Sequence, residues 1–157
     1  MNVTENKMTG SIKGAERVFL VALTVWILLQ MVRFIAIPLI QSIVAGIDAP
    51  GWMYPAMLDV LTAVVAPFLA VALWKWRGFA VWTFTVVYLV VSIVDHGGAF
   101  ISLSLIGEPA AFEALNPSGS SPWVAPIIQT ALDFVFLYLV LLPKNRRLFF
   151  ELSSPTA

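Results

Sequence analysis

Residues 79–96 read FAVWTFTVVYLVVSIVDH, an apolar run that ends in an aspartate and a histidine. About 20 apolar residues cross a bilayer as a helix, so this run predicts a transmembrane helix. Apart from Thr83, its hydroxyl-bearing and acidic residues recur at spacings of three, four and three, namely Thr85, Tyr88, Ser92 and Asp95. Residues at these spacings share one face of a helix, so the predicted span carries a polar stripe.

Three further apolar stretches of similar length occupy most of the remaining chain, namely 18–43, 55–74 and 122–142. The composition agrees with a membrane protein. Of the 157 residues, 60% are hydrophobic and only 11% are charged, whereas a soluble domain carries about 25% charged residues. We therefore predict an all-α, polytopic integral membrane protein whose four spans form a transmembrane bundle.

Basic residues set the predicted orientation of the spans. Eight of the nine precede the first span, join the second to the third, or follow the fourth. The connections 44–54 and 97–121 contain no Lys or Arg. By the positive-inside rule we expect both termini on the cytoplasmic side of the cell membrane. Residues 1–17 and 144–157 would then be cytoplasmic tails, and the two uncharged or acidic connections would be outer loops.

Glycine and proline indicate where these helices end or bend. Pro38 lies within the first span and predicts a bend there. Gly97 and Gly98 can stop or kink the third span after His96. The following residues 99–106 are apolar again, so they either continue the helix outward or lie at the membrane interface.

Each span also contains polar residues that hydrocarbon tolerates badly. They are Gln30 and Arg33 in the first span, Asp59 in the second, Asp95 and His96 in the third, and Gln129 and Asp133 in the fourth. A charge at the centre of a transmembrane helix costs about 2.5–3.5 kcal/mol. We therefore expect these residues to face one another inside the bundle, with Arg33 paired to Asp59 or Asp95.

The ligand-binding residues predicted from this pattern come from all four spans. They are Gln30, Arg33, Asp59, Thr85, Tyr88, Ser92, Asp95, Gln129 and Asp133. This set holds three aspartates and one arginine, and the surplus negative charge calls for a proton, a cation or a cationic ligand. The predicted function is therefore a small multi-pass membrane protein with an outward-opening acidic site. It would bind or transport a proton, a cation or a cationic amphiphile.

Two other functions compete with binding or transport, and whether the protein is an enzyme stays open. The first is an intramembrane acid–base enzyme acting on a lipid or terpenoid, as an isomerase, cyclase or hydrolase. Its candidate catalytic residues are Asp95, Asp133, Tyr88 and His96. The second is a non-catalytic subunit of a larger membrane complex. A purely structural Arg33–Asp59 pair that fixes helix packing is equally compatible with the sequence.

The sequence also narrows the expected cofactors and partners. The chain has no cysteine, which rules out disulfides, thiolate catalysis and cysteine-ligated metals. It has one histidine, which rules out a bis-histidine haem within this chain, and we expect no cofactor and no metal. The net charge is zero, so nucleic acid is not an expected partner. Membrane lipid, a small cationic or lipid-like ligand, and a second copy or larger complex are the expected partners.

Overall fold

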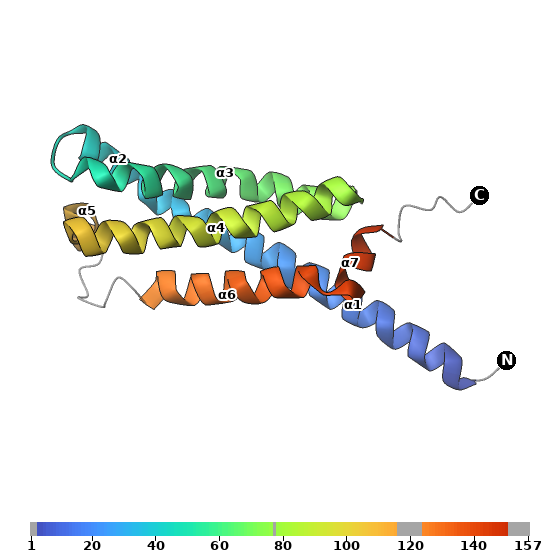
Figure 1. Ribbon diagram of the computed structural model, residues 1–157. Coiled ribbons are helices and arrows are strands. Elements are labelled where there is room, and N and C mark those ends of the chain that lie inside the picture. The colour runs from blue at the N-terminus through green and yellow to red at the C-terminus, as the bar shows by residue number, and fades with distance from the viewer. Residues whose placement is uncertain (1–2, 77, 116–123, 151–157) are drawn as a thin grey trace.

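The computed structural model describes the backbone of residues 3–76, 78–115 and 124–150, and side chains within 14–76, 78–112 and 124–150. Every regular element in these ranges is a helix (Figure 1). Four segments are long and apolar enough to cross a membrane: Gly14–Val44, Pro50–Lys75, Phe79–Ile106 and Val124–Leu141. The predicted all-α chain with four helices able to span a membrane is thus confirmed.

The first span is not a uniform α-helix. It consists of α1 (Val3–Leu29), the 3₁₀ segment η1 (Gln30–Ile35) and α2 (Ala36–Val44). Pro38 has no N–H to donate to the carbonyl of Phe34, and its ring crowds that carbonyl. The tightened segment lies directly before this proline, where a simple bend was predicted. Such 3₁₀ stretches within long helices often mark a functional site.

The second and third spans are antiparallel neighbours. The 3₁₀ turn η2 (Pro50–Trp52) leads into α3 (Met53–Lys75), and α4 (Phe79–Ile106) follows after a short turn. Gly78 closes this turn with φ +113°, a backbone conformation that favours glycine.

The third span is longer than the sequence suggested. α4 continues through Gly97 and Gly98, so the helix does not end at His96 and residues 97–106 are not an outer loop. The glycine that ends α4 is Gly107, which has φ +79° and follows the last helical residue. A glycine inside a helix costs only about 1 kcal/mol. The packing of the apolar residues after Gly98 outweighs this cost, so the helix continues.

The fourth span is α6 (Val124–Leu141), and two short helices complete the fold. α5 (Ala110–Leu115) lies near α2, and α7 (Pro143–Phe150) folds back onto α4 and α6. The buried Phe149 accepts a hydrogen bond from the N–H of Gly78 at 2.5 Å. The predicted tail from residue 144 therefore begins as a packed helix. Residues 116–123 and 151–157 of the predicted outer loop, fourth span and tail lie outside the described residues.

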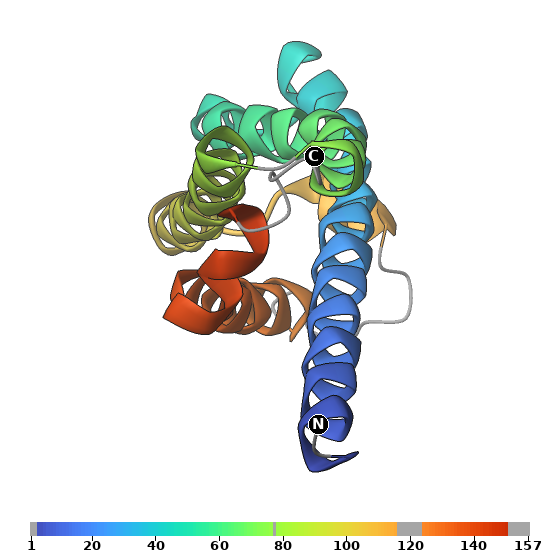
Figure 2. The same cartoon turned by 90° about the vertical axis from the view of Figure 1, so that its right-hand side faces the viewer.

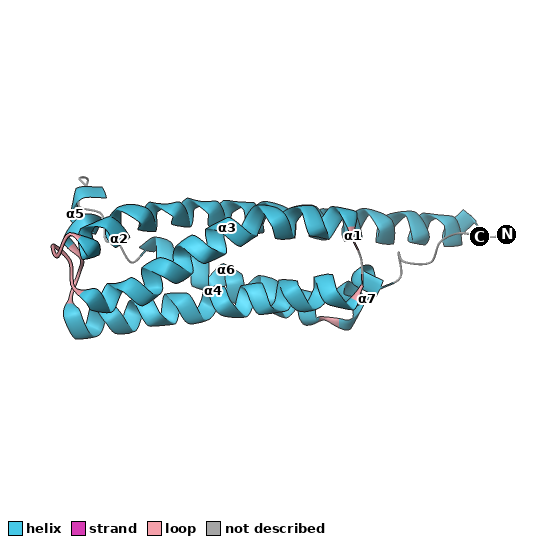
Figure 3. Ribbon diagram, turned by 90° about the horizontal axis from the view of Figure 1, so that it is seen from above, coloured by secondary structure: helices cyan, strands magenta, loops and turns pink. Residues whose placement is uncertain are grey.

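α3, α4 and α6 run side by side along one long axis, and the first span is tilted relative to them (Figure 1). Figure 2, viewed from the α7 end, shows the tilted first span beside the ends of the other three. In Figure 3, α1 extends beyond the other helices at this end, whereas α5 lies at the opposite end. We call these the α7 end and the α5 end. Large hydrophobic side chains such as Phe68, Phe84 and Phe134 stay exposed on the outer faces of the spans, as expected beside lipid.

Asp48 attaches α5 to the end of the first span. Its carboxylate accepts hydrogen bonds from the N–H groups of Ala110 at 2.6 Å and Ala111 at 3.2 Å. Burial raises the pKa of Asp48, but the hydrogen bonds from Ser42 and from these two amides outweigh it and lower the pKa below the usual value. Trp52 and Phe112 pack edge to face beside this attachment, with ring centroids 5.9 Å apart.

Candidate functional site

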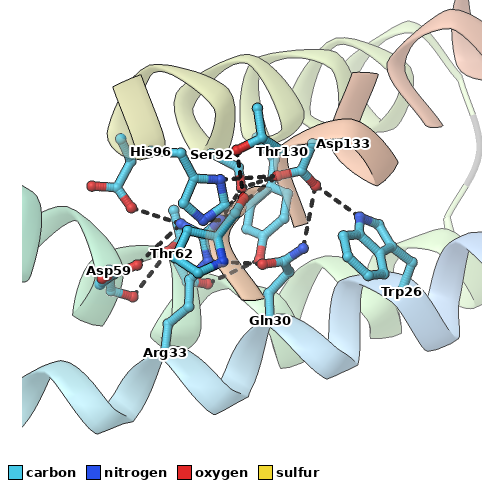
Figure 4. A network of polar contacts seen from close by, with 12 residues as sticks. Trp26, Gln30, Arg33, Asp59, Thr62, Ser92, His96, Thr130 and Asp133 are labelled. Carbon is cyan, nitrogen blue, oxygen red and sulfur yellow. Dashed lines mark hydrogen bonds and ion pairs between the residues drawn. The ribbon is translucent and has the colours of Figure 1, made fainter. Parts of the chain in front are cut away.

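A layer of buried polar residues separates two apolar cores. The core nearer the α7 end contains Leu23, Ile27, Leu73, Leu89 and Phe149, and the core nearer the α5 end contains Ala36, Leu39, Ile43, Trp52 and Ala56. Between them lie the residues of the polar layer: Gln30, Arg33, Asp59, Thr62, Ser92, Asp95, His96 and Asp133. Figure 4 shows labelled side chains of this layer from all four spans converging, among them Arg33, Asp59, His96 and Asp133. Of the polar residues expected to face one another, all but Gln129 belong to this layer.

Arg33 lies at the centre of this layer, on η1, and is 3% exposed. Its Nε donates to Gln30 Oε1 at 2.7 Å, one turn earlier on the same segment. Its Nη1 donates to two carboxylates, Asp95 Oδ2 at 2.6 Å and Asp59 Oδ1 at 3.2 Å. Arg33 thus pairs with both of the aspartates that the sequence offered as alternatives.

The second terminal nitrogen of Arg33 faces α4 and α6. Nη2 contacts Ser92 Oγ, lies 2.9 Å from His96 Nε2, and lies 3.6 Å from Asp133 Oδ2. A guanidinium has five N–H donors, and the hydrogen bonds to five side chains use all of them. Arg33 is therefore a fully saturated internal cation.

The contact with Arg33 fixes the state of His96. An arginine never accepts a hydrogen bond, so His96 Nε2 must be the acceptor and the imidazole must be neutral, with its proton on Nδ1. Among the described residues this Nδ1 has no hydrogen-bond partner, and Asp133 Oδ2 lies 3.9 Å away. The side chain of Gln129 lies beside His96 without a well-oriented hydrogen bond to that nitrogen.

Asp133 is well supplied with donors. Its Oδ1 accepts from Trp26 Nε1 at 2.8 Å and from Gln30 Nε2 at 3.2 Å, and its Oδ2 accepts from Ser92 Oγ at 2.5 Å. The sequence analysis did not include Trp26 in the site. It lies four residues before Gln30, on the same helical face, and that spacing is the signal that could have found it.

Asp95 is less well supplied. One oxygen binds Arg33, but the other oxygen, Oδ1, has no hydrogen-bond partner in the described part of the chain, although Asp95 is only 1% exposed. The carboxylate of Asp59 shares with Asp95 the donor nitrogen Nη1 of Arg33. The side chain of Asp59 is 27% exposed, whereas those of Asp95 and Asp133 are 2% and 0% exposed.

Two predicted site residues lie toward the α7 end of this layer and make ordinary structural contacts. Thr85 donates to the carbonyl of Val81 at 2.8 Å, within its own helix. Tyr88 donates to the carbonyl of Thr62 at 3.2 Å and so ties α4 to α3. The stripe on α4 is thus buried along its length, and its Ser92 and Asp95 end meets the charges.

The charges of the layer do not balance if every acid is ionised. Three carboxylates face one guanidinium, and the imidazole is neutral, so two negative charges lack a counter-charge. Within the described residues, no three acidic or histidine side chains are placed to hold a metal ion. The polar layer can therefore take up further positive charge. Its own cation, Arg33, already occupies the centre.

Comparison with known proteins adds no relative: no family model matches the chain, and no curated protein or solved structure is significantly similar to it.

Proposed function

We propose that this protein binds, or transports across the membrane, a positively charged species at the buried polar layer: a proton, a cation or a cationic amphiphile. The observation that carries the proposal is the excess of carboxylates around Arg33, enclosed between four helices able to span a membrane. Uncompensated charge in a low-dielectric interior is costly, so such a site binds positive charge or protonates. Intramembrane ionisable groups of this kind commonly mark ion and proton pathways.

Access to the layer runs through Asp59 in this proposal. Asp59 is the most exposed of the three aspartates and lies about 9 Å along α3 from its first residue, Met53, at the α5 end. The basic residues Lys75, Lys144 and Arg146 gather at the opposite end of the bundle, on α3 and α7. We accordingly assign the α7 end and both termini to the cytoplasm, and the α5 end to the outside.

The contacts give the enzyme alternative less support. The hydroxyl of Tyr88 donates to a backbone carbonyl and is 5% exposed, and His96 Nε2 is taken by Arg33. A general acid or base must reach the proton it moves on the substrate. These two residues would have to lose existing contacts first, whereas binding of a small positive species needs no such exchange.

Purified protein in liposomes tests the proposal. Vesicles would be exposed in turn to a pH gradient, to Na⁺, to K⁺ and to tetraphenylphosphonium, with proton uptake followed by an enclosed pH-sensitive dye and cation uptake followed by radiolabelled cation. We expect at least one of these probes to cross or bind saturably, and Asp95→Asn to abolish the effect while the helical content is retained. The matched control is Glu108→Gln, because Glu108 is an exposed acid outside the polar layer.

The proposal fails if no probe crosses or binds above the level of protein-free vesicles. It also fails if Asp59→Asn, Asp95→Asn and Asp133→Asn all behave like Glu108→Gln. Proton movement alone and cation movement alone both support the proposal, and they separate the species that the site takes.

A further inference from the structure

We infer that the positive species taken by the polar layer is a proton, and that it is held between the carboxyl groups of Asp59 and Asp95. This inference deepens the proposed function and rests on it, because it names the ligand of the same site. Its support is the buried oxygen Oδ1 of Asp95, which has no hydrogen-bond partner among the described residues, beside the number of acids.

The geometry of the two carboxyl groups calls for a hydrogen between them. Both accept from the same nitrogen, Nη1 of Arg33, at 2.6 and 3.2 Å, and this shared donor holds them close together. The shared donor places the two groups side by side, and two ionised carboxylates there repel each other and have no hydrogen to share. One proton on either group turns a repulsion into a hydrogen bond.

The unpaired oxygen of Asp95 also favours a proton on this pair. Asp95 Oδ1 is buried and has no donor from any described residue. Leaving a buried acceptor without a partner is destabilising, and more so for a charged group. A protonated carboxyl group at Asp59 or Asp95 removes one charge from this oxygen's surroundings. The aspartic-protease dyad shows the same chemistry, in which two neighbouring carboxyl groups share one proton.

The packing around the pair argues against larger cations. Arg33 Nη1 already lies between the two acids, 2.6 Å from Asp95 and 3.2 Å from Asp59. Apolar cores lie on either side of the layer along the bundle, and the partly exposed side chain of Asp59 is where it meets the surroundings. A proton adds no volume, so it is the positive species that this packing admits without rearrangement.

The other titratable groups facing the pair already hold the contacts that an added proton would have to replace. Asp133 on α6 accepts from Trp26, Gln30 and Ser92. On α4, Tyr88 donates to Thr62 and His96 Nε2 accepts from Arg33. Arg33 on η1 uses all five of its donors. Asp59 on α3 and Asp95 on α4 are therefore the pair to which a further proton adds a new hydrogen bond.

Infrared spectroscopy of the intact protein in nanodiscs tests this inference. The C=O stretch of a protonated carboxyl group, identified by its shift in D₂O, would be followed between pH 4 and 9. We expect the wild type to show one such band at pH 7, where an ordinary aspartate with a pKa of about 3.9 is ionised. The measurement on the wild type does not depend on any variant folding.

Variants assign the band. We expect both Asp59→Asn and Asp95→Asn to remove it, because the remaining acid of the pair keeps its hydrogen bond from Arg33 Nη1 and no longer faces a second carboxylate at that nitrogen. Asp133→Asn and the exposed control Glu108→Gln should keep it. The inference is overturned if the wild type shows no protonated carboxyl group at pH 7, or if the band disappears only in Asp133→Asn.

A titration with cations distinguishes failure of this inference from failure of the proposed function. Titration with Na⁺ or K⁺ at constant ionic strength, with choline as the replacement ion, should leave the band and the thermal stability unchanged. If Na⁺ or K⁺ instead binds and no proton is present, the proton assignment is wrong while cation binding stands. If neither protons nor cations affect the wild type, both proposals are wrong.

Discussion

Replacing Arg33 by alanine should destabilise the protein strongly, because it removes the cation from two neighbouring carboxylates. Asp95 lies 2.6 Å and Asp59 3.2 Å from the same guanidinium nitrogen. Breaking a buried ion pair by deleting one partner costs about 3–5 kcal/mol. For a chain of this size, that loss corresponds to a fall in melting temperature on the order of 10 °C.

The structure also ranks the two rescuing substitutions. The side chain of Asp95 is 2% exposed and that of Asp59 is 27% exposed, so water screens the Asp59 charge more. Adding Asp95→Asn to Arg33→Ala should therefore recover about 1–3 kcal/mol, the usual range for directly interacting residues. Adding Asp59→Asn should recover less, at most about 1 kcal/mol.

Unfolding in mixed micelles of a mild detergent and sodium dodecyl sulfate, followed by far-UV circular dichroism, measures these differences. Arg17→Ala is the matched control, because Arg17 is exposed and lies outside the polar layer. It should change the free energy of unfolding by no more than about 0.5 kcal/mol. The reasoning is refuted if Arg33→Ala behaves like Arg17→Ala, or if neither double variant is more stable than Arg33→Ala.

Three further predictions follow from the fold. Because the chain has no cysteine, single cysteines can report topology: Ile47→Cys should react with an impermeant thiol reagent added outside intact cells, and Lys144→Cys should not; the reverse pattern would contradict the proposed orientation. Asp48→Ala should lower the free energy of unfolding by about 1 kcal/mol and speed hydrogen exchange at the first amides of α5. In the wild type the attachment of α5 through Asp48 should persist above pH 4 and weaken only as the pH falls through the lowered pKa of Asp48. Gly97→Ala should stabilise the protein by about 0.4–1 kcal/mol, because no described atom lies within 4 Å of the added Cβ; a destabilisation would show that α4 does not continue as a regular helix there.

The span architecture could be predicted from the sequence because hydrocarbon imposes strong rules. An unpaired backbone group cannot remain in lipid, so a long apolar run has to be a helix. The same reasoning predicted that the polar residues would face one another, and Gln30, Arg33, Asp95 and Asp133 do meet. The cost of exposing charge to lipid is enough to predict that these residues meet, and no individual contact has to be known in advance.

The end of the third span was harder to predict because two local signals competed there. Gly97 and Gly98 have low helix propensity, but the apolar residues after them continue to pack on the neighbouring segment at the α5 end. Packing outweighed propensity, and α4 stopped at Gly107, where the backbone takes a positive φ. The 3₁₀ segment before Pro38 was likewise not predictable, since a proline can bend a helix in several ways.

The roles of the individual aspartates depend on which donors their neighbours supply, and this cannot be read from spacing. Asp95 and Asp133 both lie on polar helical faces, and their spacing does not reveal which donors face them. In the structure Asp133 receives hydrogen bonds from Trp26, Gln30 and Ser92. One oxygen of Asp95 receives none from the described residues. The surplus of acids over bases is a property of the whole set and is visible in the sequence. Which aspartate lacks donors depends on the indole of Trp26, the amide of Gln30 and the hydroxyl of Ser92, all of which donate to Asp133.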